Sequence, residues 1–187
     1  QEDRHELGAE RFALKVPDYD ADAARHLSEA EFLAHFRAEA TALMGLPQHD
    51  ALARFVSFDL GCRPKPILVM ELVEGPTLER LVDSRTLDMP RAVAALGQVP
   101  EGLGEMHALG IGHLDLKPSN VVLRGGENAV LVDFGLAGRN IRPGCGSAPY
   151  SPPEIWGATP PQSLITPMSA DVYSFACLAF ETLTCEL

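Results

Sequence analysis

The segment from His113 to Asn120, His-Leu-Asp-Leu-Lys-Pro-Ser-Asn, constrains what this chain can fold into more than any other feature. It places the side chains of Asp115, Lys117 and Asn120 within six residues, a spacing that lets one loop present all three to one point. A second polar motif, Asp133-Phe134-Gly135, begins thirteen residues after the asparagine. The surrounding elements therefore have to hold two polar motifs in place.

The first third of the chain is predicted to contain strands and one helix. Residues 11–16 have the composition of a short strand, and residues 55–60 and 67–71 form two strands joined by a turn rich in Gly and Pro. Ser28 followed by Glu31 is a capping-box signature. The apolar positions that recur at helical spacing after it are Phe32, Phe36, Ala40 and Leu43. We expect a helix that ends at residues 45–47.

The remaining chain is predicted to be mainly helical. A short helix is expected from Thr77 to about residue 83, and a longer one from Pro90 to about residue 110. Further expected elements are a hairpin of residues 121–123 and 129–132, a loop over 135–170, and an apolar helix over 171–183 that is buried on most sides. The pattern indicates two lobes meeting near residues 71–77, and a ligand is expected between them.

Taken together, the two polar motifs and their order resemble the catalytic domain of eukaryotic-type (Hanks-type) serine/threonine protein kinases. The resemblance spans essentially the whole chain. It implies an α+β, bilobal fold: a small antiparallel-sheet lobe over residues 1–72, a hinge over 73–76, and a mainly helical lobe over 77–187. Phosphoryl transfer builds negative charge, so such a site needs cations, carboxylates that hold them, and a group that receives a proton.

The resemblance also implies roles for residues of the two motifs. Asp115 would accept the proton of the substrate hydroxyl, and Lys117 would neutralise the transferring phosphoryl group. Asn120 and Asp133 would hold Mg²⁺. The implied cofactors are ATP and Mg²⁺, and the implied partner is a protein that carries serine or threonine.

Nucleotide-binding residues follow from the same resemblance. Lys15 matches the strand lysine that contacts the α and β phosphates, and Glu39 matches its carboxylate partner; taken singly, each is as well explained as a solvated charge. Residues 70–73 resemble the hinge that binds adenine, although an apolar strand end has the same pattern. The residues implied to contact adenine are Met70, Glu71, Val73, Ala13 and Val122. The residues implied to stack between the helix and the metal loop are Leu43, Phe55, His113 and Phe134, which ordinary core packing explains equally.

Two later segments agree with the family. Residues 146–154 resemble the end of an activation loop, in which Ser147 matches a substrate-positioning residue. Asp171 matches the helix aspartate that holds the backbone of the catalytic loop. A proline-rich surface loop is the alternative interpretation of residues 143–161.

The sequence also departs from the family pattern. The glycine-rich loop expected before Lys15 is missing, since Gly8 is the only glycine among the first 14 residues, and the chain stops after the last apolar helix. We therefore expect a kinase domain truncated at both ends, with flanking regulatory domains possible. Leu114 replaces the usual arginine before Asp115, and Ser147 is the only Ser or Thr between residues 135 and 150.

Composition excludes several classes of function. The 187 residues are 46% hydrophobic and 22% charged, as in a globular protein. With 15 basic and 26 acidic residues the net charge is −11, which disfavours binding to nucleic acid or anionic lipid. No membrane-spanning segment is expected, and the four cysteines lack metal-site spacing. We expect a cytoplasmic location.

The function predicted from the sequence is ATP-dependent phosphoryl transfer to serine or threonine hydroxyls of proteins. One alternative is a pseudokinase, a nucleotide-binding scaffold, which the missing glycine-rich loop favours. Another is a small-molecule phosphotransferase of the aminoglycoside-kinase type, which shares the spacing from Asp115 to Asn120.

Overall fold

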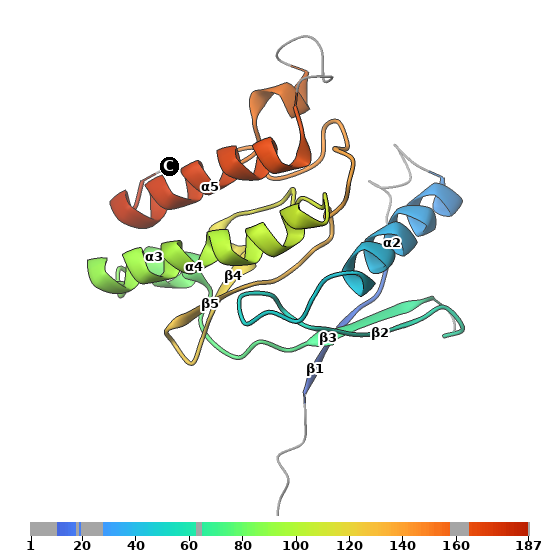
Figure 1. Cartoon of the computed structure of the whole chain (residues 1–187), viewed down its shortest axis with the longest axis horizontal. Coiled ribbons are helices and arrows are strands. Elements are labelled where there is room, and N and C mark those ends of the chain that lie inside the picture. Colours follow the sequence, from blue (N-terminus) through green and yellow to red (C-terminus); the bar gives the residue numbers. More distant parts are fainter. Residues whose placement is uncertain (1–10, 18, 20–27, 63–64, 158–164, 187) are drawn as a thin grey trace, which may run out of the picture.

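The computed structural model describes residues 11–17, 19, 28–62, 65–157 and 165–186. Of the first 14 residues, where the glycine-rich loop is missing, residues 1–10 with Gly8 lie outside these ranges. In chain order the elements are β1 (Phe12–Lys15), α2 (Glu29–Met44), β2 (Phe55–Asp59), β3 (Ile67–Glu71), α3 (Leu78–Asp83), α4 (Met89–Ala108), η1 (Pro118–Asn120), β4 (Val121–Arg124), β5 (Asn128–Leu131), η2 (Pro153–Trp156) and α5 (Pro167–Thr184). A small antiparallel sheet lies near α2, and the other helices form a second layer (Figure 1). The predicted α+β class is confirmed.

The three-stranded sheet has the order β1-β3-β2, and both pairings are antiparallel. The predicted hairpin of β2 and β3 is therefore confirmed. Ala13 of β1 lies opposite Met70 of β3, and Lys15 lies opposite Leu68. This register places Lys15 at the end of β1, where the strand leaves the sheet.

Helix α2 begins where the sequence predicts. Ser28 is its N-cap, and the capping box is complete, because the Glu31 N–H donates to Ser28 Oγ and the Ser28 N–H donates to Glu31 Oε2. The buried face of α2 carries Phe36, Glu39, Ala40 and Leu43. A carboxylate, that of Glu39, therefore lies on the buried face among apolar side chains.

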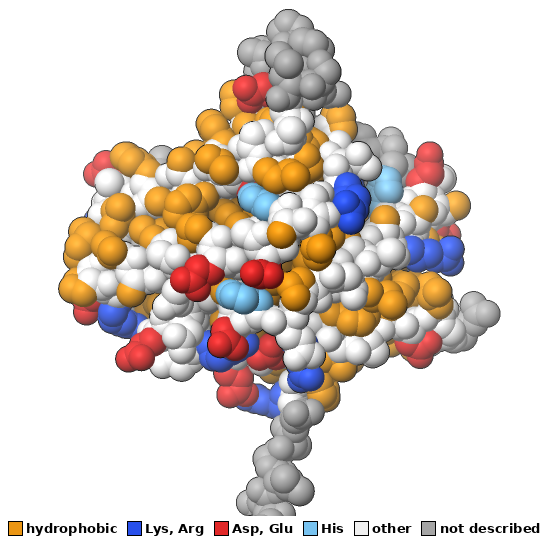
Figure 2. Space-filling model, viewed as in Figure 1, with side chains coloured by type: hydrophobic (Ala, Val, Ile, Leu, Met, Phe, Trp, Pro, Cys, Tyr) orange, Lys and Arg blue, Asp and Glu red, His pale blue; other side chains and the backbone are white. Residues whose placement is uncertain are grey.

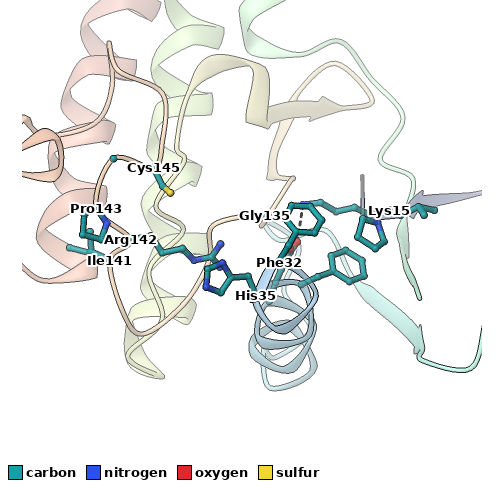
Figure 3. Close-up of a pocket in the computed structure, with 13 residues that line it drawn as sticks. Lys15, Phe32, His35, Gly135, Ile141, Arg142, Pro143 and Cys145 are labelled. Carbon is teal, nitrogen blue, oxygen red and sulfur yellow. Dashed lines mark hydrogen bonds and ion pairs between the residues drawn. The ribbon is translucent and has the colours of Figure 1, made fainter. Parts of the chain in front are cut away.

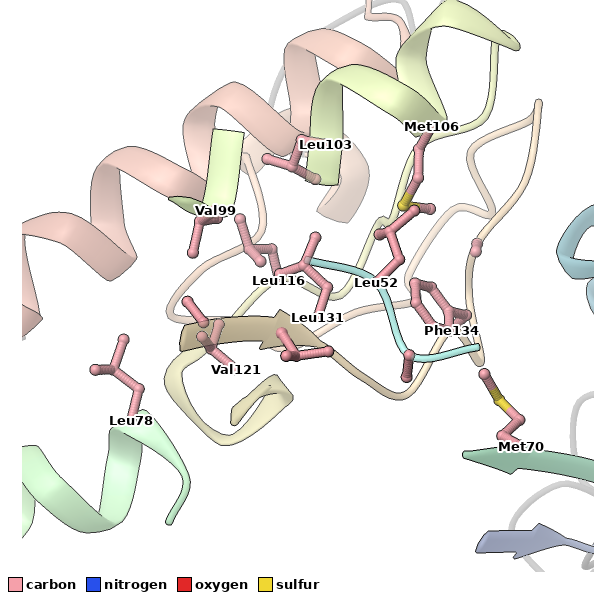
Figure 4. Close-up of a cluster of buried hydrophobic side chains, with 14 of the residues drawn as sticks. Leu52, Met70, Leu78, Val99, Leu103, Met106, Leu116, Val121, Leu131 and Phe134 are labelled. Atoms are coloured by element: carbon pink, nitrogen blue, oxygen red, sulfur yellow. The ribbon is translucent and has the colours of Figure 1, made fainter. Parts of the chain in front are cut away.

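Side chains of α3, α4 and α5 form a buried core together with side chains of the hairpin of β4 and β5. Thr77 caps α3 and Asp88 caps α4, with Pro90 in the first turn of α4 as predicted. The core side chains labelled in Figure 4 are Leu52, Met70, Leu78, Val99, Leu103, Met106, Leu116, Val121, Leu131 and Phe134. They come from both layers, so one core supports the sheet and the helices together.

Two backbone contacts join the layers. The Ala53 N–H donates to Leu131 O, and the Leu131 N–H donates to Ala51 O. At the connection between β3 and α3, the Leu123 N–H donates to Pro76 O at 2.9 Å. A Cβ at Gly75 would lie 2.1 Å from Leu123 O, so this close approach requires glycine.

The structure corrects two predictions for the C-terminal region. The segment 135–170 is not entirely a loop, because it contains η2 and the first turn of α5, which Thr166 caps through Ser169. The last helix is also not buried on most sides. Large side chains of α5 are exposed, namely Val172, Tyr173, Phe180 and Leu183. Hydrophobic side chains also gather on the face of the molecule seen in Figure 2. Helices α3 and α4 pack on one side of α5. Because apolar residues also occur on the other sides of α5, some of them stay exposed.

Among the described residues, none of the helices combines the length and apolar character needed to span a bilayer.

Candidate active site

The amine of Lys15 joins two carboxylates that are far apart in the sequence. Lys15 Nζ lies 2.8 Å from Glu39 Oε1 and 3.0 Å from Asp133 Oδ1. Glu39 is supplied by the buried face of α2, and Asp133 follows β5. The structure thus brings together the strand lysine, the helix glutamate and the first residue of the Asp133-Phe134-Gly135 motif.

The three groups differ in their electrostatic environments. Burial opposes the charge of Lys15, but Glu39 and Asp133 outweigh it and raise the Lys15 pKa. Burial raises the pKa of Glu39, and the attraction of Lys15 only partly offsets it. Burial alone would raise the pKa of Asp133, but the charge of Lys15 and its hydrogen bond outweigh burial, so the Asp133 pKa is lowered. The Glu39 side chain is almost completely buried, whereas half-exposed Asp133 remains accessible to a ligand.

Backbone geometry at residues 133–135 explains how the amine reaches this position. A Cβ at Gly135 would lie 2.6 Å from Lys15 Nζ, so glycine leaves the space that the amine fills. Asp133 has φ 56°, a left-handed conformation that is uncommon for a residue with a side chain. Such conformations cluster at functional sites, where the surrounding structure holds them in place.

The loop after α4 forms a second polar cluster around Asp115. Its Oδ1 accepts from Ser147 Oγ at 2.9 Å, and its Oδ2 accepts from Lys117 Nζ at 2.9 Å. Lys117 Nζ also donates to Ser147 Oγ at 2.8 Å. Asn120 Nδ2 donates to Asp115 O at 2.8 Å and lies 3.3 Å from Asp115 Oδ2. The three residues that the sequence places in one loop do meet, and Ser147 joins them.

Asp171 at the start of α5 holds this loop from beneath. Its Oδ2 accepts from the His113 N–H and its Oδ1 from the Leu114 N–H, both at 2.8 Å. His107 Nε2 donates to the same Oδ2 at 2.8 Å. Leu114 has φ 63°, so the turn directly before Asp115 is in the left-handed region. The completely buried carboxylate thus fixes a strained turn beside the polar cluster.

His113 and Phe134 link the two motifs through their rings, which lie 5.3 Å apart. His113 Nε2 donates to Val132 O at 3.2 Å, and Nδ1 has no hydrogen-bond partner among the described residues. Burial lowers the His113 pKa, so the ring is neutral. Leu43 and Phe134 belong to the same buried core, with Phe55 packed against it. These contacts agree with both interpretations of the four residues, a stack from α2 to the second motif and ordinary core packing.

Asn120 and Asp133 have suitable oxygens for Mg²⁺. Because Asn120 uses its amide nitrogen for Asp115, its Oδ1 remains available as a ligand. Asp133 is half-exposed, and Lys15 binds its Oδ1. No group of three or more His, Cys, Asp or Glu side chains suited to a metal is found within the described residues. Two protein oxygens plus phosphate oxygens and water match the coordination that Mg²⁺ usually takes in nucleotide sites.

The residues implied to contact adenine lie around the connection between the layers. Ala13 and Met70 face each other in the sheet, and Val122 on β4 pairs with Thr77 in an isolated bridge. Val73 packs against the core. The Glu71 N–H donates to Arg54 O at 2.9 Å, so that N–H is not available to a ligand.

Several interactions at the site had no signal in the sequence motifs. Glu71 Oε1 lies 2.7 Å from Arg124 Nη2, an ion pair that joins β3 to β4. Tyr150, near the end of the segment that contains Ser147, donates to Glu181 Oε2 of α5 at 2.6 Å. Residues that lie so far apart in sequence have no local pattern that pairs them.

Comparison with known proteins identifies the class. The family model described as protein kinase domain matches residues 4–187, and the chain belongs to this family. It is 37% identical over 183 residues to the serine/threonine-protein kinase PknL of Mycobacterium bovis, covering 92% of this chain and 42% of the relative. It is 33% identical over 190 residues to the serine/threonine-protein kinase pkn2 of Myxococcus xanthus, covering 95% and 21%. It is 34% identical over 173 residues to the serine/threonine-protein kinase PkaB of Streptomyces coelicolor, covering 83% and 40%. The chain thus spans less than half the length of these curated relatives.

Proposed function

We propose that this chain carries the catalytic apparatus for transferring the γ-phosphoryl group of ATP to a serine or threonine hydroxyl of a protein substrate. One observation carries the proposal: the Asp115 carboxylate is held between Ser147 and Lys117, next to the amide of Asn120. The kinases to which the chain is similar are serine/threonine-protein kinases by name.

Asp115 is proposed to receive the proton of the attacking hydroxyl. Its two oxygens are oriented by Ser147 and Lys117, and Asp171 holds the backbone of the preceding turn. A fixed carboxylate lowers the entropy cost of aligning the hydroxyl with the phosphorus atom. Lys117, 2.9 Å from Asp115, supplies positive charge where negative charge develops on the transferred group.

Lys15 is proposed to bind the phosphates of ATP, and Glu39 to hold Lys15 in position. The Glu39 side chain is almost completely buried, which restricts its rotamers and so those of the amine bonded to it. Asn120 and Asp133 are proposed to hold Mg²⁺, which bridges phosphate oxygens and neutralises their charge. Ala13, Met70, Val73 and Val122 are proposed to contact adenine. Glu71 is proposed to contact adenine through backbone atoms other than its N–H, which already donates to Arg54 O.

The arrangement favours catalysis over nucleotide binding alone. A scaffold that only binds nucleotide needs Lys15 and Asp133 but has no use for a carboxylate oriented by both Ser147 and Lys117. Ser147 belongs to residues 146–154, which resemble the end of the family's activation loop and contain the Pro153-Glu154 dipeptide. This resemblance favours a protein acceptor over a small molecule. The cytoplasmic location and the lobe boundaries at residues 72 and 77 stay predictions.

The test is phosphoryl transfer from radiolabelled ATP by the chain, with a mixed-sequence Ser/Thr peptide library and kanamycin as alternative acceptors. Asp115→Asn is expected to lower kcat by about 10²- to 10⁴-fold while leaving nucleotide affinity unchanged, and the control Asp83→Asn on exposed α3 is expected to leave both unchanged. Nucleotide binding without turnover on any acceptor would favour the pseudokinase alternative. Transfer to kanamycin alone would favour the small-molecule phosphotransferase.

A further inference from the structure

Two cavities of the protein differ in their relation to the proposed active site. One, of about 870 Å³, lies between α2 and residues 141–145 with Lys15 and Gly135 at one end, so it adjoins the phosphate site (Figure 3). The other, of about 480 Å³, is lined mainly by polar residues. Its lining includes none of the side chains proposed to bind phosphate or Mg²⁺ or to transfer the phosphoryl group. The polar cavity is therefore unexplained by the proposed function.

The polar cavity lies where four segments of the chain meet. His49 and Asp50 come from the connection between α2 and β2, and Arg54 directly precedes β2. Glu71 is the last residue of β3, and Arg124 is the last residue of β4. A ligand in this cavity would therefore contact both the three-stranded sheet and the hairpin of β4 and β5.

Glu71 and Arg124 form a rigid, internally neutralised part of the lining. Glu71 Oε1 lies 2.7 Å from Arg124 Nη2, and Glu71 Oε2 accepts from the Arg54 N–H at 3.2 Å. Arg124 Nη1 donates to Asp50 O at 3.4 Å. Both oxygens of the Glu71 carboxylate are thus occupied, and the backbone at Asp50 and Arg54 is tied to this pair.

Three other groups of the lining have unused capacity for hydrogen bonds. The exposed side chains of Arg54 and Asp50 make no hydrogen bond or ion pair with any other residue in the described part of the chain. His49 is half-buried, and its Nδ1 accepts from the Ala51 N–H at 3.2 Å. A ring nitrogen that accepts carries no proton, so the proton is on Nε2, which is left as a donor. The cavity thus offers a guanidinium, an imidazole N–H and a carboxylate.

The charges of these groups select the class of ligand. Since Glu71 and Arg124 neutralise each other, Arg54 and Asp50 leave one positive and one negative charge without a partner. Asp50 and the net charge of −11 oppose a phosphate, and Arg54 opposes a metal ion. A small molecule that carries one anionic and one cationic group matches both unpaired charges at once.

A second, apolar cavity adjoins the polar one. It has a volume of about 190 Å³, and Arg54 and Leu52 line both cavities. Its apolar lining includes Leu43, Leu46 and Phe55. Because a water molecule takes about 30 Å³, this cavity has the volume of about six waters, which suits one large side chain but not a second molecule.

We propose that the two cavities bind a free α-amino acid with a large apolar side chain. Its carboxylate binds the Arg54 guanidinium and the His49 Nε2–H, its ammonium group binds Asp50, and its side chain fills the apolar cavity. A guanidinium presents donors in a planar fork that matches a carboxylate. A free amino acid fits better than a segment of a protein, because a residue within a protein lacks both charged groups and a chain end has only one.

The probe is L-phenylalanine, and isothermal titration calorimetry measures its affinity. Each of three matched analogues lacks one group: 3-phenylpropanoate lacks the ammonium group, 2-phenylethylamine lacks the carboxylate, and glycine lacks the side chain. L-Phenylalanine is expected to bind about 10-fold or more tightly than each of them, because each analogue leaves one part of the site unpaired or unfilled.

Variants of the two unpaired side chains locate the site. Arg54→Gln and Asp50→Asn are each expected to weaken L-phenylalanine binding by about 10- to 100-fold, the range of one hydrogen bond to a charged group. In Asp50→Asn, the difference between L-phenylalanine and 3-phenylpropanoate is expected to shrink, because the ammonium group has lost its partner. Arg80→Gln and Asp83→Asn make the same changes on exposed positions of α3 outside both cavities and are expected to leave the affinity unchanged.

Four results would overturn the proposal. The first is no binding of either L-phenylalanine or L-leucine. The second is equal affinity for L-phenylalanine and 3-phenylpropanoate, as expected for a site that binds only anions. The third is binding that responds to neither Arg54→Gln nor Asp50→Asn. The fourth is competition with magnesium and a non-hydrolysable ATP analogue, which would place the amino acid in the nucleotide site. Because these measurements require no turnover, they are independent of the proposed kinase activity.

Discussion

Leu114 and Ile155 lie in one small apolar cluster, and this contact joins the turn before Asp115 to the 3-10 helix η2. Ala170 of α5 completes the buried part of the cluster, and Leu136, Ile141 and Ile165 pack around it. At the position where the family usually has an arginine, this chain therefore has an apolar side chain. The segment that contains Ser147 is held against the catalytic loop by packing at this position.

Shortening Leu114 tests this packing. Leu114→Ala is expected to lower the free energy of unfolding by about 2–5 kcal/mol, because Leu114 is buried and the smaller side chain leaves a cavity. Leu114→Met keeps the volume and is expected to cost less than about 1.5 kcal/mol. Urea unfolding followed by circular dichroism measures both, and equal small losses for the two variants would contradict the packing role.

Leu114 at the position of the usual arginine predicts that activity does not depend on phosphorylation of residues 135–150, because the arginine that would bind such a phosphate is absent. Ser147 is the only Ser or Thr in this range, and its hydroxyl already binds Asp115 and Lys117. Phosphatase treatment of the kinase-active protein is expected to leave kcat unchanged, with mass spectrometry used to verify that phosphate was removed. A large loss of activity traced to a phosphate in this range would show that another cation replaces the arginine.

The contact of Lys15 with Glu39 predicts non-additive effects of mutation. Lys15→Met and Glu39→Gln each disrupt the same 2.8 Å interaction, so the double variant is expected to lose little more activity than Lys15→Met alone. A double-mutant cycle on kcat/KM measures the coupling, for which about 0.5–3 kcal/mol is typical of residues in one network. Additive losses would mean that the two side chains act separately during turnover.

The sequence predicted those parts of the site that depend on local pattern. Asp115, Lys117 and Asn120 lie within six residues, and the hairpin that follows them leaves Asp133 little freedom of position. Lys15 and Glu39 were identified through the order of motifs, and the structure places them in contact. The capping box at Ser28 predicted the start of α2, because capping depends on residues three apart.

What the sequence did not predict depends on contacts between distant segments. The ion pair of Glu71 with Arg124 connects residues 53 positions apart, and composition and periodicity contain no information on such pairs. The exposure of Val172 and Phe180 was also missed, because an apolar helix sequence does not specify which neighbours cover it. The cavity beside Arg54 likewise arises from how four segments of the chain are placed, which is a tertiary property.

Tyr150 is expected to stabilise the segment after Ser147 through its hydroxyl. Burial raises the Tyr150 pKa, and the hydrogen bond to Glu181 and the charge of Glu181 raise it further, so the hydroxyl stays protonated and donates. Tyr150→Phe is expected to lower the free energy of unfolding by about 1.5–3 kcal/mol, the range for a hydrogen bond to a charged group. Tyr173→Phe, on the exposed face of α5, is the control and is expected to have a small effect. Thermal denaturation of both variants is the measurement. Equal decreases in Tm for Tyr150→Phe and Tyr173→Phe would argue against the role of Tyr150.

His113 predicts a dependence of stability on pH. Burial lowers its pKa below the ordinary value of 6.5, so the unfolded chain binds a proton at a pH where the folded chain does not. The contribution of His113 to stability is therefore fully present above about pH 6.5 and is lost as the pH falls from there toward the folded pKa. The loss from one such group is at most about 1.4 kcal/mol per pH unit.

The measurement is the free energy of unfolding in urea at intervals between pH 5 and pH 7.5. His113→Phe keeps a ring against Phe134 but removes the titrating group, so it is expected to flatten the pH dependence. It is also expected to cost about 1 kcal/mol near pH 7.5, because the partly buried Val132 O loses the donor Nε2. His35→Gln is the matched control because it removes a half-exposed imidazole. An unchanged slope in His113→Phe would mean that the buried ring is not the group whose protonation opposes folding.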